Sequence, residues 1–306
     1  MEIRKTIIPA ASFGTRFLPI TRVIPQEMLP LFNKPAIHHI VEEAIAAHVP
    51  HCFIVTNASK HAIADYFDSV ELSGVSVSSQ HEKDFIAASK LLEPRCSCVY
   101  LRQTDALGVG HAVLLAKQCL GKEYFCIALP DEIIDAKEPV LSQLMRVARQ
   151  EKTSVIAVQE IPLSSVSEHS IIDVKKAIAH NLFQINGIVD RPDPRNAPSN
   201  LAIVGRYVVS SKLISALEYS YTFSEKGEVS LHDSIIRMMH NNERVFAYKI
   251  QGTRYSLNTP LGLLRATIAL ALKDPVYAPH VRGLLKELEQ TKVPVFNPAR
   301  MVEELL

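Results

Sequence analysis

The sequence predicts an α/β fold, a Rossmann-like three-layer α/β/α arrangement with a mixed central sheet. In the first half, short apolar runs alternate with longer segments of helical periodicity, which is typical of βαβ units and a parallel sheet. After about residue 150, apolar runs follow one another with little helix between them, which indicates antiparallel strands added to that sheet. At about 150 residues per domain, a chain of 306 residues can form two domains or one large α/β domain.

The first half supplies the alternating elements. Its strands are expected at residues 3–9, 52–56, 97–102 and 124–129, and its helices at about 36–48, 59–68 and 110–120. The second half is richer in strands. These are expected at 153–161, 170–175, 183–189, 201–209 and 243–251, with helices near 211–219 and 230–241 and over 259–291.

Charge and cysteine content exclude several classes of protein. Lys and Arg number 33 against 32 Asp and Glu, and this balance argues against a nucleic-acid partner bound by a broad basic face. The five cysteines lie mostly in apolar runs, which indicates buried, reduced thiols and a cytoplasmic protein. The N-terminal apolar run is too short for a signal peptide, and Leu263–Leu272 is too short to span a bilayer, so we expect no membrane partner.

The loop after the first strand contains the residue types that bind phosphate. In an open parallel sheet, ligands bind beyond the carboxyl ends of the strands. The small residues Ala10 and Ala11 would let backbone N–H groups reach a phosphate, Gly14 allows close approach, and Arg16 offers a two-pronged donor. This short pattern by itself equally fits a plain turn with a surface arginine.

The longer string PAASFGTRFLPITRVIPQEMLP (residues 9–30) resembles the signature loop of sugar-phosphate nucleotidyltransferases, in detail that of the bacterial UTP–glucose-1-phosphate uridylyltransferase family. The resemblance continues through LRQTDALGVGHAVLLAK (101–117), LPDE (129–132), APSNLAIVGRYV (197–208) and KGEVSLHDSI (226–235). It implies a nucleotidyltransferase domain over residues 1–275, with a nucleotide-binding part at about 1–135 and a sugar-binding part at about 136–275. A helical tail would follow at 276–306.

By resemblance, the reaction would transfer UMP from UTP to glucose 1-phosphate, with Mg²⁺ as cofactor, and would give UDP-glucose and pyrophosphate. Asp131 would bind Mg²⁺, although its position also suits a helix N-cap, and Glu228 could equally be a surface charge. The implied site residues are Ala10, Ala11, Gly14, Gln103 and Gly108 for the nucleotide, Arg16, Asp131 and Arg191 for catalysis, and Gly205, Glu228 and Asp190 for the sugar.

The family also implies a homo-oligomer, with the helices from about residue 276 as the candidate interface. The apolar spacing of Val281, Leu284, Leu285 and Leu288 equally fits packing on the chain's own core.

The departures from the family pattern lie at the expected chemistry. Ser12 and Ser170 stand where the family has glycine, Gln26 where it has lysine, and Ser256 where it has aspartate. Asp190 and Arg191 replace a Glu-Lys pair. Loss of a charged donor near a developing anionic transition state costs about 10²–10³ in rate.

These departures leave three hypotheses open. The first is a divergent enzyme in which Arg191, Arg22 or Lys60 compensates for the lost charges. The second is a catalytically impaired paralogue that binds or regulates an active enzyme. The third is a nucleotidyltransferase for a different nucleotide, such as dTTP.

Overall fold

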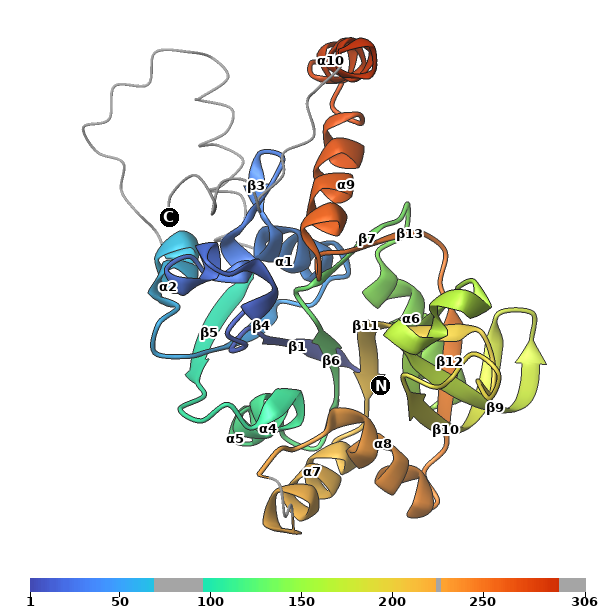
Figure 1. The fold of residues 1–306 in the computed structure, drawn as a ribbon. Coiled ribbons are helices and arrows are strands. Elements are labelled where there is room, and N and C mark those ends of the chain that lie inside the picture. The colour runs from blue at the N-terminus through green and yellow to red at the C-terminus, as the bar shows by residue number, and fades with distance from the viewer. Residues whose placement is uncertain (69–95, 224–226, 292–306) are drawn as a thin grey trace, which may run out of the picture.

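The computed structural model describes residues 1–68, 96–223 and 227–291. Its centre is a nine-stranded sheet with helices on both sides (Figure 1), so the predicted α/β class with a mixed sheet is confirmed. In spatial order the strands are β5 (Ser97–Arg102), β4 (His51–Thr56), β1 (Ile3–Pro9), β6 (Tyr124–Ala128), β11 (Leu201–Val209), β8 (Ser154–Glu160), β12 (Val245–Lys249), β10 (Leu182–Asp190) and β9 (Ser170–Ala179).

The first half forms the parallel part of the sheet. β1 lies between β4 and β6 and runs parallel to both, and β4 runs parallel to β5. The four carboxyl ends therefore meet at one edge of the sheet, where a ligand site is expected. The apolar sequences of β4 and β6 follow from this position, because a strand covered on both faces has no solvated side, whereas β5 lies at the edge of the sheet and is partly exposed.

The second half adds the antiparallel part. β11 pairs antiparallel with β6 on one side and with β8 on the other. β12 runs parallel to β8, and β10 is antiparallel to both β12 and β9. Ile171 of β9 also pairs with Ala202 of β11, so the far end of the sheet curls back toward its middle.

Two apolar layers separate the sheet from its helices. One side packs against α1 (Ala36–Ala46), α6 (Val140–Glu151) and α9 (Pro260–Ala271), and the other against α4 (Gly108–Leu115), α7 (Lys212–Phe223) and α8 (Leu231–His240). In α1, the buried residues Ile37, Ile40, Val41 and Ala44 show the i, i+3, i+4, i+7 spacing of one helical face. The sheet with one layer of helices on each side gives the three-layer arrangement that the sequence predicts.

Smaller elements complete the described chain. β2 (Pro30–Leu31) pairs with β3 (Lys34–Pro35), and β7 (Glu132–Asp135) pairs with β13 (Thr253–Ser256). α2 (His61–Phe67) follows β4, α5 (Lys117–Leu120) follows α4, and α10 (Ala278–Gln290) follows α9 and projects from the body (Figure 1). In the described ranges no helix is both long and apolar enough to cross a membrane.

The sequence did not predict α6, β7 or β13. α6 buries Leu141, Leu144, Met145 and Ala148 at helical spacing, so its signal was present in the sequence. β7 and β13 are four residues each and depend on one another for pairing, which local pattern does not reveal. The division into nucleotide-binding, sugar-binding and tail parts stays a prediction, and residues 292–306 of the expected tail lie outside the described residues.

Candidate active site

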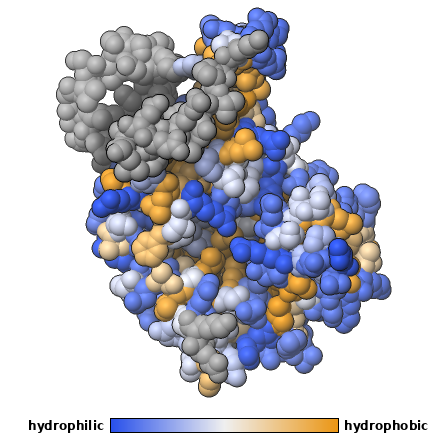
Figure 2. Space-filling view, viewed as in Figure 1, coloured by the Kyte–Doolittle hydropathy of each residue, from blue (hydrophilic) through white to orange (hydrophobic). Residues whose placement is uncertain are grey.

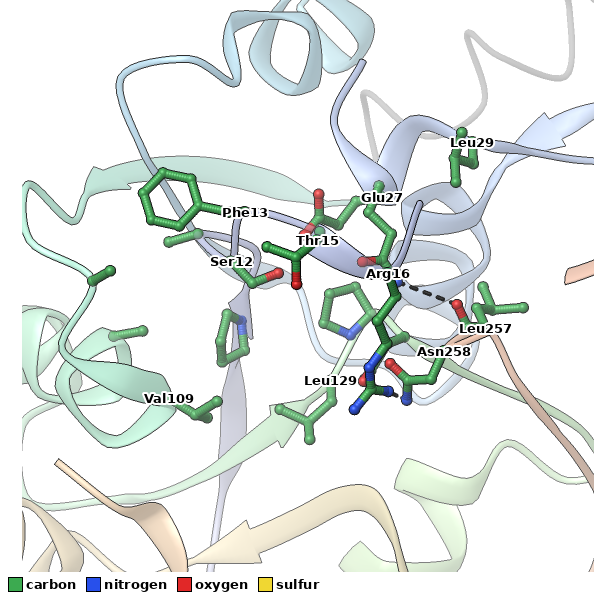
Figure 3. A pocket seen from close by; sticks show the side chains of 18 of the residues that line it. Ser12, Phe13, Thr15, Arg16, Glu27, Leu29, Val109, Leu129, Leu257 and Asn258 are labelled. Atoms are coloured by element: carbon green, nitrogen blue, oxygen red, sulfur yellow. Dashed lines mark hydrogen bonds between the residues drawn. The ribbon is translucent and has the colours of Figure 1, made fainter. Parts of the chain in front are cut away.

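A cavity of about 440 Å³ opens at the carboxyl ends of the parallel strands (Figure 3). Its walls come from the loop after β1, the turn between β5 and α4, the end of β6, and the segment that enters α9. The sequence-predicted residues among its lining are Ala11, Ser12, Gly14, Arg16, Gln26, Gln103, Gly108 and Asp131. Two separate stretches that were predicted to bind the nucleotide therefore meet here with Asp131, which was predicted to bind Mg²⁺.

The loop after β1 is shaped by a glycine that no other residue could replace without strain. Ala10 is fully buried and its N–H donates to the Val55 carbonyl, so it ends the strand rather than lining the cavity. Gly14 has φ +63°, and a Cβ there would lie 3.0 Å from Gln26 Cβ. Thr21 Oγ1 donates to the Gly14 carbonyl at 2.7 Å, which closes the turn. Arg16, two residues further on, lines the cavity (Figure 3).

Gln26 lies on the cavity wall, but its donor is engaged. Gln26 Nε2 donates to the Leu257 carbonyl at 3.2 Å and ties the loop to the entry of α9 (Figure 3). The lysine expected here by resemblance would bring a charge that the amide does not have.

Next to Gln26, a buried ion pair fixes the same wall. Glu27 and Lys60 are each 4% exposed, and Lys60 Nζ contacts both carboxylate oxygens at 2.7 and 2.6 Å. Burial raises the pKa of Glu27 and lowers the pKa of Lys60, while their mutual attraction opposes both shifts. Lys60 is therefore held by Glu27 and does not line the cavity, which removes it as a substitute for the missing lysine.

The opposite wall presents an amide held in a fixed plane. Gln103 is 5% exposed, and its Nε2 contacts the Gly108 carbonyl at 3.2 Å and His111 Nδ1 at 3.0 Å. Burial lowers the pKa of His111, so its ring is neutral near pH 7 and Nδ1 can accept this hydrogen bond. Gly108 has φ +86°, and a Cβ there would lie 3.0 Å from Glu228 Cγ, which places Glu228 beside this wall.

Asp131 follows β6 and forms the floor of the cavity. Its Oδ2 accepts a hydrogen bond from Asn258 Nδ2 at 2.9 Å, and its backbone carbonyl accepts from the Leu257 N–H. Asn258 Nδ2 also reaches Ser256 Oγ at 3.3 Å. Ser256 pairs with Glu132 in the β7–β13 ribbon, so it lies close to Asp131 although it does not line the cavity.

A fully buried arginine holds the chain on both sides of Asp131. Arg206 donates to the Leu129 carbonyl at 2.9 Å and to the Glu132 carbonyl at 2.8 Å. Its Nε donates to Glu43 Oε2 at 3.0 Å, which balances its charge. Sequence reasoning missed Arg206, although a charge inside the apolar run LAIVGRYVV was a usable signal.

The donor atoms around Asp131 fit a hard cation. The Asp131 carboxylate and the nearby Ser256 hydroxyl offer oxygen atoms of the kind that Mg²⁺ prefers, whereas Asn258 turns its Nδ2 donor toward both of them. In the part of the chain that the structure describes, no cluster of three or more His, Cys, Asp or Glu side chains could hold a metal. Such a site fits Mg²⁺ only where substrate phosphates complete the coordination.

The predicted sugar-side residues do not line the cavity, although Gly205 and Glu228 lie against the lining residues Leu129 and Gly108. Gly205 lies against Leu129, whose N–H donates to the Gly205 carbonyl. Asp190 accepts a hydrogen bond from Ser170 Oγ at 2.7 Å, and the Arg191 N–H donates to the His169 carbonyl. Arg22 is exposed and also lies outside the lining.

One hydrogen bond lies within the electrostatic reach of both Asp190 and Asp131. His232 Nε2 contacts Tyr207 Oη at 3.0 Å. Burial lowers the pKa of His232, an effect that the charge of Asp190 opposes, and burial together with the charge of Asp131 raises the pKa of Tyr207. Asp190 and Asp131 therefore act on the two partners of one hydrogen bond.

A parallel-sheet edge with a glycine-containing loop, an arginine and a carboxylate at the end of a strand is typical of a nucleotide-handling enzyme of the nucleotidyltransferase class. Comparison with known proteins agrees, since the model of the family described as "Nucleotidyl transferase" matches residues 5–255. The chain belongs to this family.

The relatives are uridylyltransferases. A UTP–glucose-1-phosphate uridylyltransferase of Staphylococcus epidermidis is 38% identical over 288 residues, which are 94% of this chain and 99% of that protein. UTP–glucose-1-phosphate uridylyltransferase 1 of Staphylococcus saprophyticus is 36% identical over 95% of this chain and 100% of its own length.

Solved structures extend the likeness to the fold. A UDP-glucose pyrophosphorylase of Acinetobacter baumannii superposes with a TM-score of 0.85 at 32% identity, covering 94% of this chain and all of that one. A UDP-glucose pyrophosphorylase complexed with UDP-glucose gives a TM-score of 0.80 at 31% identity, covering 89% of this chain and 100% of the other.

Proposed function

We propose that this chain transfers a uridylyl group from UTP to glucose 1-phosphate, with release of pyrophosphate. One observation carries the proposal: a single cavity collects the phosphate-type loop, the Gln103–Gly108 wall and Asp131. The names of the relatives, and the UTP-bound and UDP-glucose-bound structures that the fold resembles, support these substrates.

In this proposal the cavity binds UTP along its length. The backbone around Ala11 and Gly14 holds the phosphates, and Arg16 braces the triphosphate through its guanidinium. Gln103 and Gly108 recognise uracil. Because Gln103 Nε2 is held by Gly108 and His111, its amide plane is fixed before the base arrives.

The transfer step needs little covalent chemistry from the protein. A phosphate oxygen of glucose 1-phosphate attacks the α-phosphorus of UTP, a new P–O bond forms, and the bond to the β-phosphate breaks with release of pyrophosphate. The protein contributes position and charge neutralisation. Asp131 would hold Mg²⁺, which supplies positive charge to phosphate oxygens when bound.

Glucose 1-phosphate is proposed to bind beside Asp131, between Gly205, Glu228 and Asp190. Arg191 would neutralise its phosphate. The Arg191 backbone has φ +47°, and its N–H is held by the His169 carbonyl, so the side chain leaves the strand from a fixed position.

Gln26 and Ser256 favour a second candidate function, that of an impaired paralogue that binds an active enzyme. Gln26 directs its donor to a backbone carbonyl, and Ser256 has no charge. We therefore expect slow turnover. Pyrophosphate release from UTP, glucose 1-phosphate and Mg²⁺ tests this: a rate equal to that of the Staphylococcus epidermidis relative under the same conditions would refute slow turnover.

The nucleotide preference can be tested separately from turnover. A ligand that binds only the folded state raises the melting temperature. We expect UTP to raise it more than dTTP does at equal concentration. The reverse order would favour the thymidylyl alternative.

We further propose that the chain acts in the cytoplasm as a homo-oligomer through α9 and α10. Within its described residues α10 buries no side chain, and Leu284 and Leu288 are 52% and 50% exposed. Leu261 and Leu264 of α9 are exposed as well, and Figure 2 shows apolar residues gathered along α9. Mass measurement in solution tests this, and a monomer at all concentrations would contradict it.

A further inference from the structure

Three thiols lie together on one face of the sheet, away from the cavity. Cys52 of β4 is directly opposite Cys98 of β5 in the parallel register. Cys96 precedes β5 and is two residues from Cys98, so the two side chains share a face. The sulfur atoms of Cys96 and Cys52 are 3.1 Å apart, and both residues are buried, at 7% and 0% exposure.

We propose that Cys52 and Cys96 form a site of reversible disulfide modification. A disulfide bond is about 2.04 Å long, so the two sulfurs, now 3.1 Å apart, must approach by about 1 Å. Cys96 lies diagonally across from Cys52 and before the first residue of β5, where a small shift of the chain together with side-chain rotation would supply this approach. Cys119 and Cys126 have no such partner in the described parts of the chain, so the pairing would be selective.

Cys96 is the better nucleophile of the pair. Hydrogen bonds from Cys52 and Cys98 lower the pKa of Cys96, whereas the same hydrogen bond and burial raise the pKa of Cys52. The thiolate is the reactive form of cysteine. Cys98 is only partly buried and lies next to both thiols, so it marks the side from which a small oxidant arrives.

The oxidant is a hydroperoxide, and the step balances in two stages. The Cys96 thiolate attacks a peroxide oxygen, the O–O bond breaks, and the leaving oxygen takes up a proton and departs as an alcohol, or as water when the oxidant is hydrogen peroxide. The Cys52 thiol then attacks the sulfenic acid on Cys96, the S–S bond forms, and water leaves. The two sulfurs together lose two electrons and two hydrogens, and a small dithiol reverses the change.

A metal is a poorer occupant of this cluster. Structural zinc sites take four nitrogen or sulfur ligands in a tetrahedron. The described residues offer these three thiols without the arrangement that would hold a metal ion.

The cross-link would brace a segment that supports the cavity. Residues 52–96 would become a closed loop, and this loop includes Asn57, which donates to the Ala11 carbonyl, and Lys60, which holds Glu27. Closing a loop of this length restricts the unfolded chain. Because Cys52 and Cys96 lie at the amino ends of β4 and β5, opposite the cavity, bound nucleotide should not block the reaction.

The test treats the folded full-length chain with hydrogen peroxide, blocks remaining thiols by alkylation, and maps the peptides by mass spectrometry. We expect a Cys52–Cys96 cross-linked peptide that disappears after dithiothreitol, with Cys126 unchanged. The melting temperature of the oxidised protein should rise by about 5 °C or more. Cys96→Ser should abolish both changes, while the matched control Cys119→Ser should leave them intact.

Peptide mapping of the unmutated chain tests the Cys52–Cys96 disulfide even if a variant folds poorly. Oxidation confined to Cys98 or Cys119, a pairing other than Cys52–Cys96, or a cross-link that forms only after denaturation would overturn the proposal. The same would follow if the cross-link formed without a rise in melting temperature.

Discussion

At the scale of single residues, Arg206 is the clearest structural support of the candidate site. Its guanidinium is fully buried and binds Glu43 together with the carbonyls of Leu129 and Glu132. Removing one partner of a buried ion pair leaves the other charge uncompensated, at a cost of about 3–5 kcal/mol. We expect Arg206→Met to lower the free energy of unfolding by about this amount, measured by urea denaturation.

Arg146→Met is the matched control. Arg146 pairs with Glu138 on the surface, where both side chains are about half exposed. Such a pair contributes at most about 1 kcal/mol. Equal losses in the two variants would show that Arg206 has no special structural role.

Two neutral residues account for the slow turnover that we expect. Gln26→Lys restores a positive charge on the cavity wall, and Ser256→Asp restores a carboxylate beside Asp131. Charged groups aimed at the transition state are each worth about 10²–10³ in rate. We expect the double variant to release pyrophosphate at least about 10-fold faster than the unmodified chain. An unchanged rate would mean that other residues have replaced both charges.

At the scale of elements, α4 depends on a glycine for its close packing. A Cβ at Gly110 would lie 2.5 Å from the Val229 carbonyl and 2.9 Å from Leu217 Cδ2. We expect Gly110→Ala to destabilise the fold by about 1–3 kcal/mol. Because Val229 would shift together with Glu228, the KM for glucose 1-phosphate should also rise.

Gly283→Ala is the control for that substitution. Gly283 lies within α10, and a Cβ there meets nothing within 4 Å. Alanine is favoured over glycine inside a helix by about 0.5–1 kcal/mol, so the control should be slightly more stable. If thermal unfolding moves in the same direction for both variants, the packing argument fails.

The helix α1 should make the fold sensitive to acid. Burial lowers the pKa of His39 from 6.5 to about 4, although Glu42 opposes the shift. Below pH 6.5 the unfolded chain therefore takes up a proton that the folded chain does not. The free energy of unfolding should fall by up to about 3 kcal/mol between pH 6.5 and 4. His39→Gln should flatten this dependence, whereas His280→Gln on exposed α10 should not.

Elements with strong local patterns could be predicted from the sequence, and paired ones could not. β1, β5 and β11 match their expected bounds because each carries a cluster of apolar and β-branched or aromatic residues that is typical of a strand. β7 and β13 form only by pairing with each other, and a local sequence pattern does not show such pairing. The candidate site shows the same difference between local and long-range signals. The loop at Gly14 and Arg16 could be predicted from its own string of residues, whereas Asn258 and Lys60 contact partners that are far away in the sequence.

At the scale of the whole molecule, the near-zero net charge conceals a local arrangement. Positive and negative side chains meet in buried pairs around the cavity, at Glu27–Lys60 and Glu43–Arg206, and these cancel in the total. Phosphate binding then depends on a few residues such as Arg16 rather than on a basic surface.

The central claim is uridylyl transfer at this cavity. The most direct test incubates the full chain with UTP, glucose 1-phosphate and Mg²⁺ and measures UDP-glucose and pyrophosphate together. We predict equal amounts of both products, formed only when Mg²⁺ is present and lost in Asp131→Asn. Absence of UDP-glucose under conditions where UTP raises the melting temperature would contradict the account and favour a binding role.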